Sequence, residues 1–196
     1  MINGGETREA NAIIGGKEQG KSTYTKEIVE MYRKAGERVI ILTETEPRAY
    51  EKYKRIYNVE SLTRSDCPRV VKYYNSEDAF FMLKEIYQLC IQGKIRGGLL
   101  VLEDATTYFD PWPVREIRQL LTNHRMFNLD IIITSHSLDL FPKFCRKMVS
   151  TVTVFKTSEV YEKPAEMKAL KYGNYKALYE AWTHCMNAPS KERKST

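Results

Sequence analysis

Residues 11–23, NAIIGGKEQGKST, carry the pattern that decides the fold. A short apolar run, NAII, is followed by the spacing G-x-x-x-x-G-K-S and then by a helical pattern over residues 21–35. A glycine-rich turn can point consecutive backbone N–H groups toward one anion, and the positive end of the following helix faces the same anion. The stretch therefore predicts a loop that binds the phosphates of a nucleotide.

Every residue of this loop is a candidate for contact with that nucleotide: Gly15, Gly16, Lys17, Glu18, Gln19, Gly20, Lys21, Ser22 and Thr23. Lys21 can reach the β- and γ-phosphates as a point charge, and the Ser22 hydroxyl is short enough to hold a Mg²⁺ ion that bridges them. Thr23 suits a second role, as a neighbour that packs under the start of the helix.

The rest of the chain alternates short β-rich apolar runs with helical patterns. The runs are NAII (11–14), RVIILT (38–43), RVVKYY (69–74), GLLVL (98–102), DIIIT (130–134) and STVTVF (150–155). Helical patterns cover residues 21–35, 76–91 and 113–125 between them. Several runs are apolar throughout, as in strands covered on both faces. We therefore predict an α/β fold of three layers, with a mostly parallel central sheet between helices.

Length and composition fit one domain with an added C-terminal element. The chain has 196 residues and a net charge of +6, from 31 Lys plus Arg and 25 Asp plus Glu. We expect an ATPase-type core over residues 1–160, a helical element over 161–186 that packs on it, and a polar tail over 187–196. The positive charge is compatible with nucleic acid or nucleotide phosphates, but it does not choose between them.

The cysteines and the hydropathy pattern exclude several other classes of protein. Cys67, Cys90, Cys145 and Cys185 form no C-x-x-C pair, so they predict reduced, mostly buried thiols, with neither a zinc site nor a redox site. No stretch approaches the roughly 18 apolar residues of a membrane span. We expect no transmembrane segment and a cytoplasmic location.

Two carboxylates follow the apolar run GLLVL, where a parallel strand would end. Glu103 and Asp104 suit a second magnesium partner and a general base for the attacking water. In one assignment Glu103 holds Mg²⁺ through its water shell and Asp104 activates the water. Most such sites read Asp and then Glu, so in the other assignment Asp104 is the metal partner and the general base lies elsewhere; both assignments stay open.

Further polar residues follow the run DIIIT. Ser135 and His136 stand where a side chain can sense a γ-phosphate or orient the attacking water, and the sequence makes them equal candidates. An arginine that faces the developing charge raises the rate of phosphoryl transfer by about 10³ to 10⁵. Arg125 is the first choice, ahead of Arg115 and Arg118, and any of the three could act in the site of a neighbouring subunit.

Three stretches in this order resemble the core of the FtsK/HerA class of P-loop ATPases: GGKEQGKST, LLVLEDA and NHRMFNLDIIITSH. The class includes DNA pumps, viral genome-packaging ATPases and the Zot-like assembly proteins of filamentous phages. The resemblance implies Mg²⁺-dependent ATP hydrolysis, double-stranded DNA as partner, and a ring of five or six subunits. Arg125 matches the class arginine, whereas Ser135 and His136 stand where Gln is common. The small size implies a viral or phage packaging ATPase, in the host cytoplasm or with the virion and its portal.

A second resemblance leads to an alternative function. LLVLEDATTYFDP and IIITSHSLDL also look like the end of an ABC-type ATPase, although the chain lacks an LSGGQ-like segment between the loop and the acidic pair. The alternative is an ATP-dependent switch or assembly protein, Zot-like or ABC-like, that does not translocate DNA. A small-molecule kinase is disfavoured because no Arg-rich lid is evident.

Overall fold

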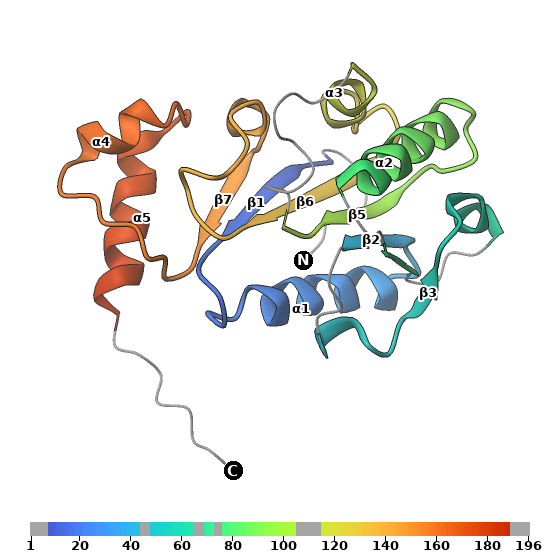
Figure 1. Ribbon diagram of the computed structural model, residues 1–196, viewed down its shortest axis with the longest axis horizontal. Helices are drawn as coiled ribbons and strands as arrows, with labels where there is room; N and C mark the ends of the chain where they lie inside the picture. Colours follow the sequence, from blue (N-terminus) through green and yellow to red (C-terminus); the bar gives the residue numbers. More distant parts are fainter. Residues whose placement is uncertain (1–7, 44–47, 65–68, 73–75, 105–114, 189–196) are drawn as a thin grey trace, which may run out of the picture.

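A computed structural model describes residues 8–43, 48–64, 69–72, 76–104 and 115–188 (Figure 1). Its centre is a seven-stranded sheet in the order β3-β4-β2-β5-β6-β1-β7, in which every recorded pairing is parallel. The strands are β1 Ala10–Ile14, β2 Val39–Thr43, β3 Lys54–Ile56, β4 Arg69–Lys72, β5 Gly98–Leu102, β6 Leu129–Ser135 and β7 Thr151–Val154. Because all strands run the same way, their carboxyl ends meet at one edge of the sheet.

Helices cover both faces of this sheet. The α-helices are α1 Lys21–Lys34, α2 Ser76–Ile91, α3 Arg115–Thr122, α4 Pro164–Ala169 and α5 Tyr175–Asn187, and the 3₁₀ helices are η1 Arg48–Tyr50, η2 Val59–Arg64 and η4 Cys145–Lys147. In Figure 1, α1 lies on one side of the strands, and α2 and α3 lie on the other. The three-layer α/β prediction is confirmed.

Alternation along each strand explains why the central runs are apolar throughout. In β2, Val39 and Ile41 belong to the core cluster that packs on α1, whereas Ile40 and Leu42 belong to the cluster under α2 and α3. The residues of β5 divide in the same way. Successive side chains of a strand point to opposite faces, so a strand with a helix on each side needs an apolar residue at every position.

All six expected strands form, and the structure adds one that the pattern did not predict. Lys54–Ile56 forms β3, a three-residue edge strand that pairs with β4 and exposes Lys54 and Arg55. A short charged edge strand lacks the apolar run that marks the central ones. The helical pattern over 113–125 is shorter in the structure, because α3 covers Arg115–Thr122, while residues 113 and 114 lie outside the described part.

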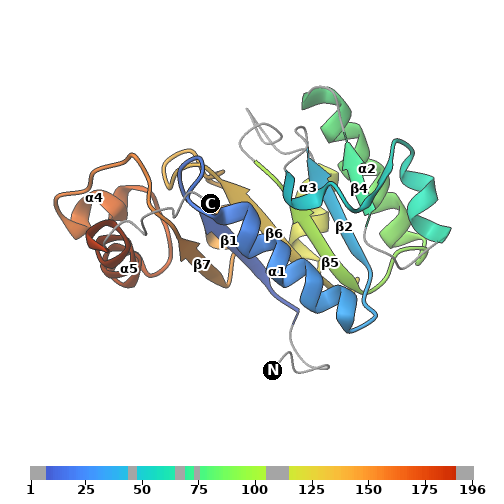
Figure 2. The same cartoon turned by 90° about the horizontal axis from the view of Figure 1, so that it is seen from below.

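The C-terminal segment forms two helices beside β7, the last strand of the sheet. Figure 2 shows α4 and α5 together beyond this strand. The Trp182 indole on α5 donates to the Thr157 hydroxyl at 3.2 Å, just after β7. Cys90 and Cys145 are buried free thiols, Cys185 is half-buried, and Cys67 lies outside the described residues. Within the described part of the chain, no helix has both the length and the apolar character to cross a membrane.

Candidate nucleotide site

The predicted phosphate loop begins between the ends of two neighbouring strands. Gly15 N–H donates to the carbonyl of Ser135 at 3.1 Å, and Gly16 N–H donates to the carbonyl of Lys156 at 2.7 Å. A Cβ added to Gly15 would lie 2.4 Å from Cβ of Phe155, which follows β7. Gly20 has a φ of +97°, in the left-handed region that favours glycine. Gly15 therefore has no room for a side chain, and Gly20 has a backbone conformation that favours glycine.

Lys21, the first residue of α1, turns back into this loop. Its side chain is buried, with Nζ donating to the carbonyls of Gly15 and Gly16 and lying 3.2 Å from Nδ1 of His136. Burial lowers the pKa of the Lys21 ammonium, and the charges of Asp104 and Glu103 act in the opposite direction. The ammonium is thus held among acceptors at the position from which it can reach a phosphate in the loop.

The hydroxyls that follow Lys21 differ in burial. Ser22 is half-buried on the first turn of α1, whereas Thr23 is exposed. The packing role expected for Thr23 belongs instead to Thr25, which is fully buried and donates to the carbonyl of Lys21 at 3.0 Å. Only one side of the first turns of a helix faces the core, and in α1 that side carries Thr25, two residues after Thr23.

Glu103, directly after β5, is a buried carboxylate with both oxygens engaged. The Tyr50 hydroxyl donates to Oε1 at 2.5 Å, and the Thr134 hydroxyl donates to Oε2 at 2.7 Å. Burial raises the pKa of Glu103, whereas the hydrogen bonds from Tyr50 and Thr134 lower it. Each carboxylate oxygen can accept a second hydrogen bond, so this arrangement fixes the carboxylate without using all its acceptor capacity.

Asp104, the next residue, faces the opposite way. Its backbone has a φ of 54°, and its N–H donates to Oγ1 of Thr134 at 2.9 Å. The side chain is 39% exposed and accepts from Nε2 of His136 at 2.8 Å. Because the Lys21 ammonium can only donate, Nδ1 of His136 is the acceptor, and Nε2 carries the proton given to Asp104. His136 therefore links the loop lysine to this carboxylate.

Ser135 and His136, equal candidates in the sequence, have different surroundings. Ser135 is fully buried, and its hydroxyl donates to the carbonyl of Ser137 at 3.1 Å. The side chain of His136 is 34% exposed and stands between Lys21 and Asp104. The structure brings His136 into the site and keeps the Ser135 side chain within the loop after β6, where only its backbone carbonyl supports Gly15.

The three candidate arginines have different surroundings. Arg125 is exposed and its Nε donates to the carbonyl of Arg8 at 3.1 Å, before the start of β1, whereas the loop follows the end of β1. The five residues of β1 separate the two ends by about 16 Å. Arg115 is exposed, and Arg118 lies over the ring of Phe144 at 5.1 Å. Arg125 therefore does not reach the phosphate loop of its own chain.

Tyr50 is a site residue that the sequence analysis missed. It lies in η1, is 2% exposed and stacks on Tyr53, whose hydroxyl donates to Glu30 on α1. Lys52 also contacts Glu30, at 2.6 Å, and these contacts lower the pKa of Glu30 to about 2. No motif marks a tyrosine at this place. The only signal is a cluster of aromatic residues after the second strand, in a stretch with no other assigned role.

The oxygen ligands of the site suit magnesium. Ser22 and Glu103 supply a hydroxyl and a carboxylate, and Mg²⁺ is typically held by one or two such groups together with waters and substrate phosphates. Within the described residues, no group of three His, Cys, Asp or Glu side chains could hold a metal alone. The donor set fits a cation that arrives with a phosphate.

Comparisons with known proteins agree with this fold. A family model described as "Zonular occludens toxin (Zot)" matches residues 25–170. The genome packaging NTPase B204 from Sulfolobus turreted icosahedral virus 2, in complex with AMP, superposes with a TM-score of 0.73 at 19% identity, covering 90% of this chain and 87% of that one. VirB4 of Thermoanaerobacter pseudethanolicus gives 0.67 at 12% identity, over 91% and 84%. No curated protein matches the sequence.

Proposed function

Because the chain belongs to the Zonular occludens toxin (Zot) family and is a P-loop NTPase, we propose that it hydrolyses ATP with Mg²⁺ in order to move DNA. The motif resemblance to the FtsK/HerA class is confirmed by the family match and by the fold. The observation that carries the proposal is the chain of contacts from the loop through Lys21 and His136 to Asp104. It joins the loop lysine to a carboxylate whose side chain is 39% exposed.

In this proposal Lys21 exchanges its carbonyl contacts for the β- and γ-phosphates of ATP. Asp104 is the general base, because its side chain is 39% exposed and is joined through His136 to Lys21 in the loop. Asp104 accepts a proton from that water, the water oxygen bonds to the γ-phosphorus, and the bond to the β,γ-bridging oxygen breaks. The products are ADP and inorganic phosphate. His136 positions Asp104 through its Nε2 proton.

Glu103 is then the magnesium partner, together with Ser22. Its burial and its two hydroxyl donors support a fixed carboxylate that accepts hydrogen bonds from metal-bound water. Mg²⁺, when bound, neutralises charge that develops on the transferred phosphoryl group. This assignment matches the first of the two alternatives that the sequence leaves open.

The proposed assembly is a homo-oligomeric ring of five or six subunits. The position of Arg125 supports it, because this exposed side chain lies at the end of the sheet opposite its own loop. An arginine placed there can serve only the site of a neighbouring subunit. Arg125 is therefore proposed to act in trans on the γ-phosphate, and residues 1–160 are proposed to form the ring core.

Double-stranded DNA is the proposed polymer, and packaging of a viral or phage genome into the virion is the proposed process. Support comes from the net charge of +6 and from the likeness in fold to a packaging NTPase. We place such a protein in the host cytoplasm, or with the virion and its portal. The test is ATP hydrolysis at low salt, with and without duplex DNA, alongside sedimentation with nucleotide. A monomer whose hydrolysis DNA does not stimulate would contradict the motor.

The family match favours a second candidate, a nucleotide-dependent assembly or switch protein that does not translocate DNA. In such a protein ATP binding shapes an interface and turnover is incidental. The two candidates differ in turnover. A motor hydrolyses steadily with DNA and loses this activity in both Lys21→Ala and Asp104→Asn. A switch binds ATP tightly, hydrolyses it negligibly and changes its oligomeric state on binding.

A further inference from the structure

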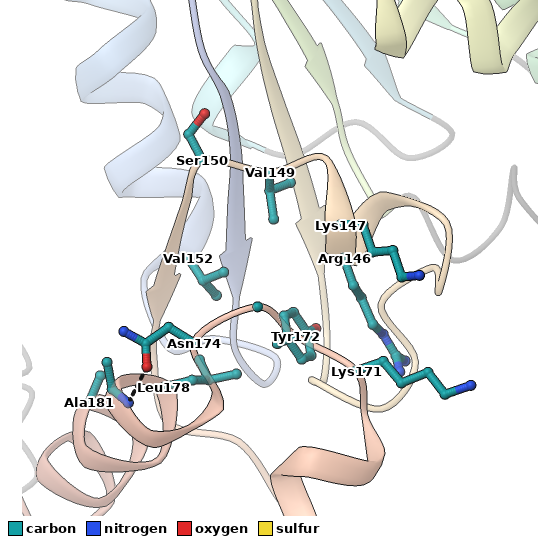
Figure 3. A pocket seen from close by; sticks show the side chains of 12 residues that line it. Arg146, Lys147, Val149, Ser150, Val152, Lys171, Tyr172, Asn174, Leu178 and Ala181 are labelled. Atoms are coloured by element: carbon teal, nitrogen blue, oxygen red, sulfur yellow. Dashed lines mark hydrogen bonds between the residues drawn. The ribbon is translucent and has the colours of Figure 1, made fainter.

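A cavity of about 690 Å³ lies beside β7, away from the residues that hold the nucleotide loop (Figure 3). Its walls come from the turn before β7, from β7 itself, and from the connection between α4 and α5. Val152 and Leu178 contribute apolar surface, and the cations are Arg146, Lys147 and Lys171. None of the residues that line it is acidic.

The three cations have no carboxylate partner in the described residues. Arg146 is buried, and its guanidinium donates to the backbone carbonyls of Asp139, Phe141 and Leu170. Lys147 and Lys171 are exposed, and the described part of the chain provides no ion pair for either. Figure 3 shows both lysines extending to the same side as the Arg146 guanidinium. Positive charge is therefore concentrated at one end of the cavity.

Two carboxylates approach the same wall without entering the cavity. Asp139 and Glu159 both act electrostatically on the Tyr172 hydroxyl. Glu159 is engaged elsewhere, because it accepts from the backbone N–H groups of Leu138 and Asp139 at 2.8 and 2.9 Å. Asp139 belongs to the loop after β6 and Glu159 to the segment after β7, and among the described residues neither forms an ion pair with Lys147 or Lys171.

The polar side chains that line the cavity mainly offer donors. Two lysines offer ammonium groups, and Asn174 offers its amide NH₂, because its Oδ1 already accepts from Ala177 N–H at 3.2 Å. A phosphate group only accepts hydrogen bonds, so it matches this set in both charge and polarity. An acidic peptide that added a strand along the edge of β7 would bind mainly through the backbone N–H and carbonyl groups of that edge. It would use few of the donor side chains that line the cavity.

We propose that this cavity binds the phosphate backbone of DNA, a proposal that rests on the proposed DNA-dependent function. Its position gives a bound strand a route to the nucleotide loop. β7 forms one wall of the cavity, and the residues directly after it, Phe155 and Lys156, contact Gly15 and Gly16. Val152, the lining residue of β7 closest along the chain to the loop, is three residues before Phe155 and four before Lys156.

The test is the salt dependence of duplex DNA binding. Each phosphate contact by a cation contributes about −0.9 to the slope of log affinity against log salt concentration. Lys147→Gln with Lys171→Gln is expected to flatten this slope by about 1.8. The matched control, Lys34→Gln with Lys94→Gln, removes two exposed lysines from other surfaces and is expected to leave the slope unchanged. Ala177→Lys, which adds a cation to the wall, is expected to steepen it by about 0.9.

The outcomes separate this proposal from the proposed function. If the wild-type protein binds DNA but the cavity variants and the control variant have equal salt-dependence slopes, the cavity assignment is overturned while the proposed function stands. If the wild-type protein binds no DNA at low salt, both fall. If an acidic peptide binds and its affinity alone responds to the lysine substitutions, the cavity is a peptide site and the DNA assignment is wrong. Unchanged thermal unfolding of each variant confirms that the fold is retained.

Discussion

The nucleotide site and the cavity beside β7 treat charge in different ways. In the nucleotide site the central charged side chains have partners within the site, with Lys21 linked through His136 to Asp104, and Glu103 held by two hydroxyls. In the cavity, Arg146 meets neutral backbone carbonyls and the ring of Tyr172, and the two lysines have no ion pair in the described residues. In the first arrangement, polar side chains are held by partners that they can exchange for a ligand. The second leaves a positive field for which the described residues provide no opposite charge.

Lys21→Ala should have the largest effect. Removal of the ammonium deletes the charge proposed to meet the β- and γ-phosphates, and we expect ATP hydrolysis to fall by about 10³-fold. Steady-state phosphate release measures the loss of hydrolysis, and calorimetric titration with ATP and Mg²⁺ measures the loss of nucleotide binding. Lys34→Ala, at the exposed last turn of α1, is the control and should retain wild-type turnover. If Lys21→Ala hydrolyses ATP normally, the loop is not a phosphate site.

Arg146→Met tests the cavity as a structural element. The substitution leaves the carbonyls of Asp139, Phe141 and Leu170 without their donor in a buried region. We expect the free energy of unfolding to fall by about 3 kcal/mol, because an unsatisfied buried polar group costs 1–3 kcal/mol and several are created. Denaturant unfolding measures the change. Lys147→Met, one residue later and exposed, should shift it by less than about 0.5 kcal/mol. Equal shifts would show that Arg146 does not hold this region together.

Asp104→Asn and Glu103→Gln separate the two adjacent carboxylates. Loss of a general base lowers the rate by about 10²-fold or more, so Asp104→Asn should bind ATP with Mg²⁺ normally and hydrolyse it slowly. Glu103→Gln should lose the extra ATP affinity that Mg²⁺ provides, while its affinity for ATP without metal stays unchanged. Nucleotide titrations with Mg²⁺ and with EDTA distinguish the variants. The opposite pattern would reverse the assignment of the pair.

The sequence predicted the elements whose signals are local. The apolar runs of β2 and β5 and the glycines of the loop depend on their own neighbourhoods, and all formed as expected. The choice between Ser135 and His136 depended on side-chain directions at the end of β6, which the sequence pattern does not contain. Tyr50 and Arg146 were out of reach for a related reason. Their partners lie 53 residues away for Tyr50, and as far as 24 for Arg146, so only the folded chain brings them together.

Tyr50→Phe should have the smallest effect, and it tests how far the partners in the nucleotide site matter. The ring continues to fill its buried place against Tyr53, while Glu103 loses one donor. A hydrogen bond of this kind contributes about 1 kcal/mol, so we expect the Mg²⁺-dependent gain in ATP affinity to shrink about fivefold. Affinity without metal should not change, because Tyr50 does not contact the loop. The matched control is Tyr53→Phe, on the same segment as Tyr50, which removes the hydroxyl that donates to Glu30 on α1. If both variants weaken metal-dependent binding equally, the segment acts as a whole and Tyr50 does not position Glu103.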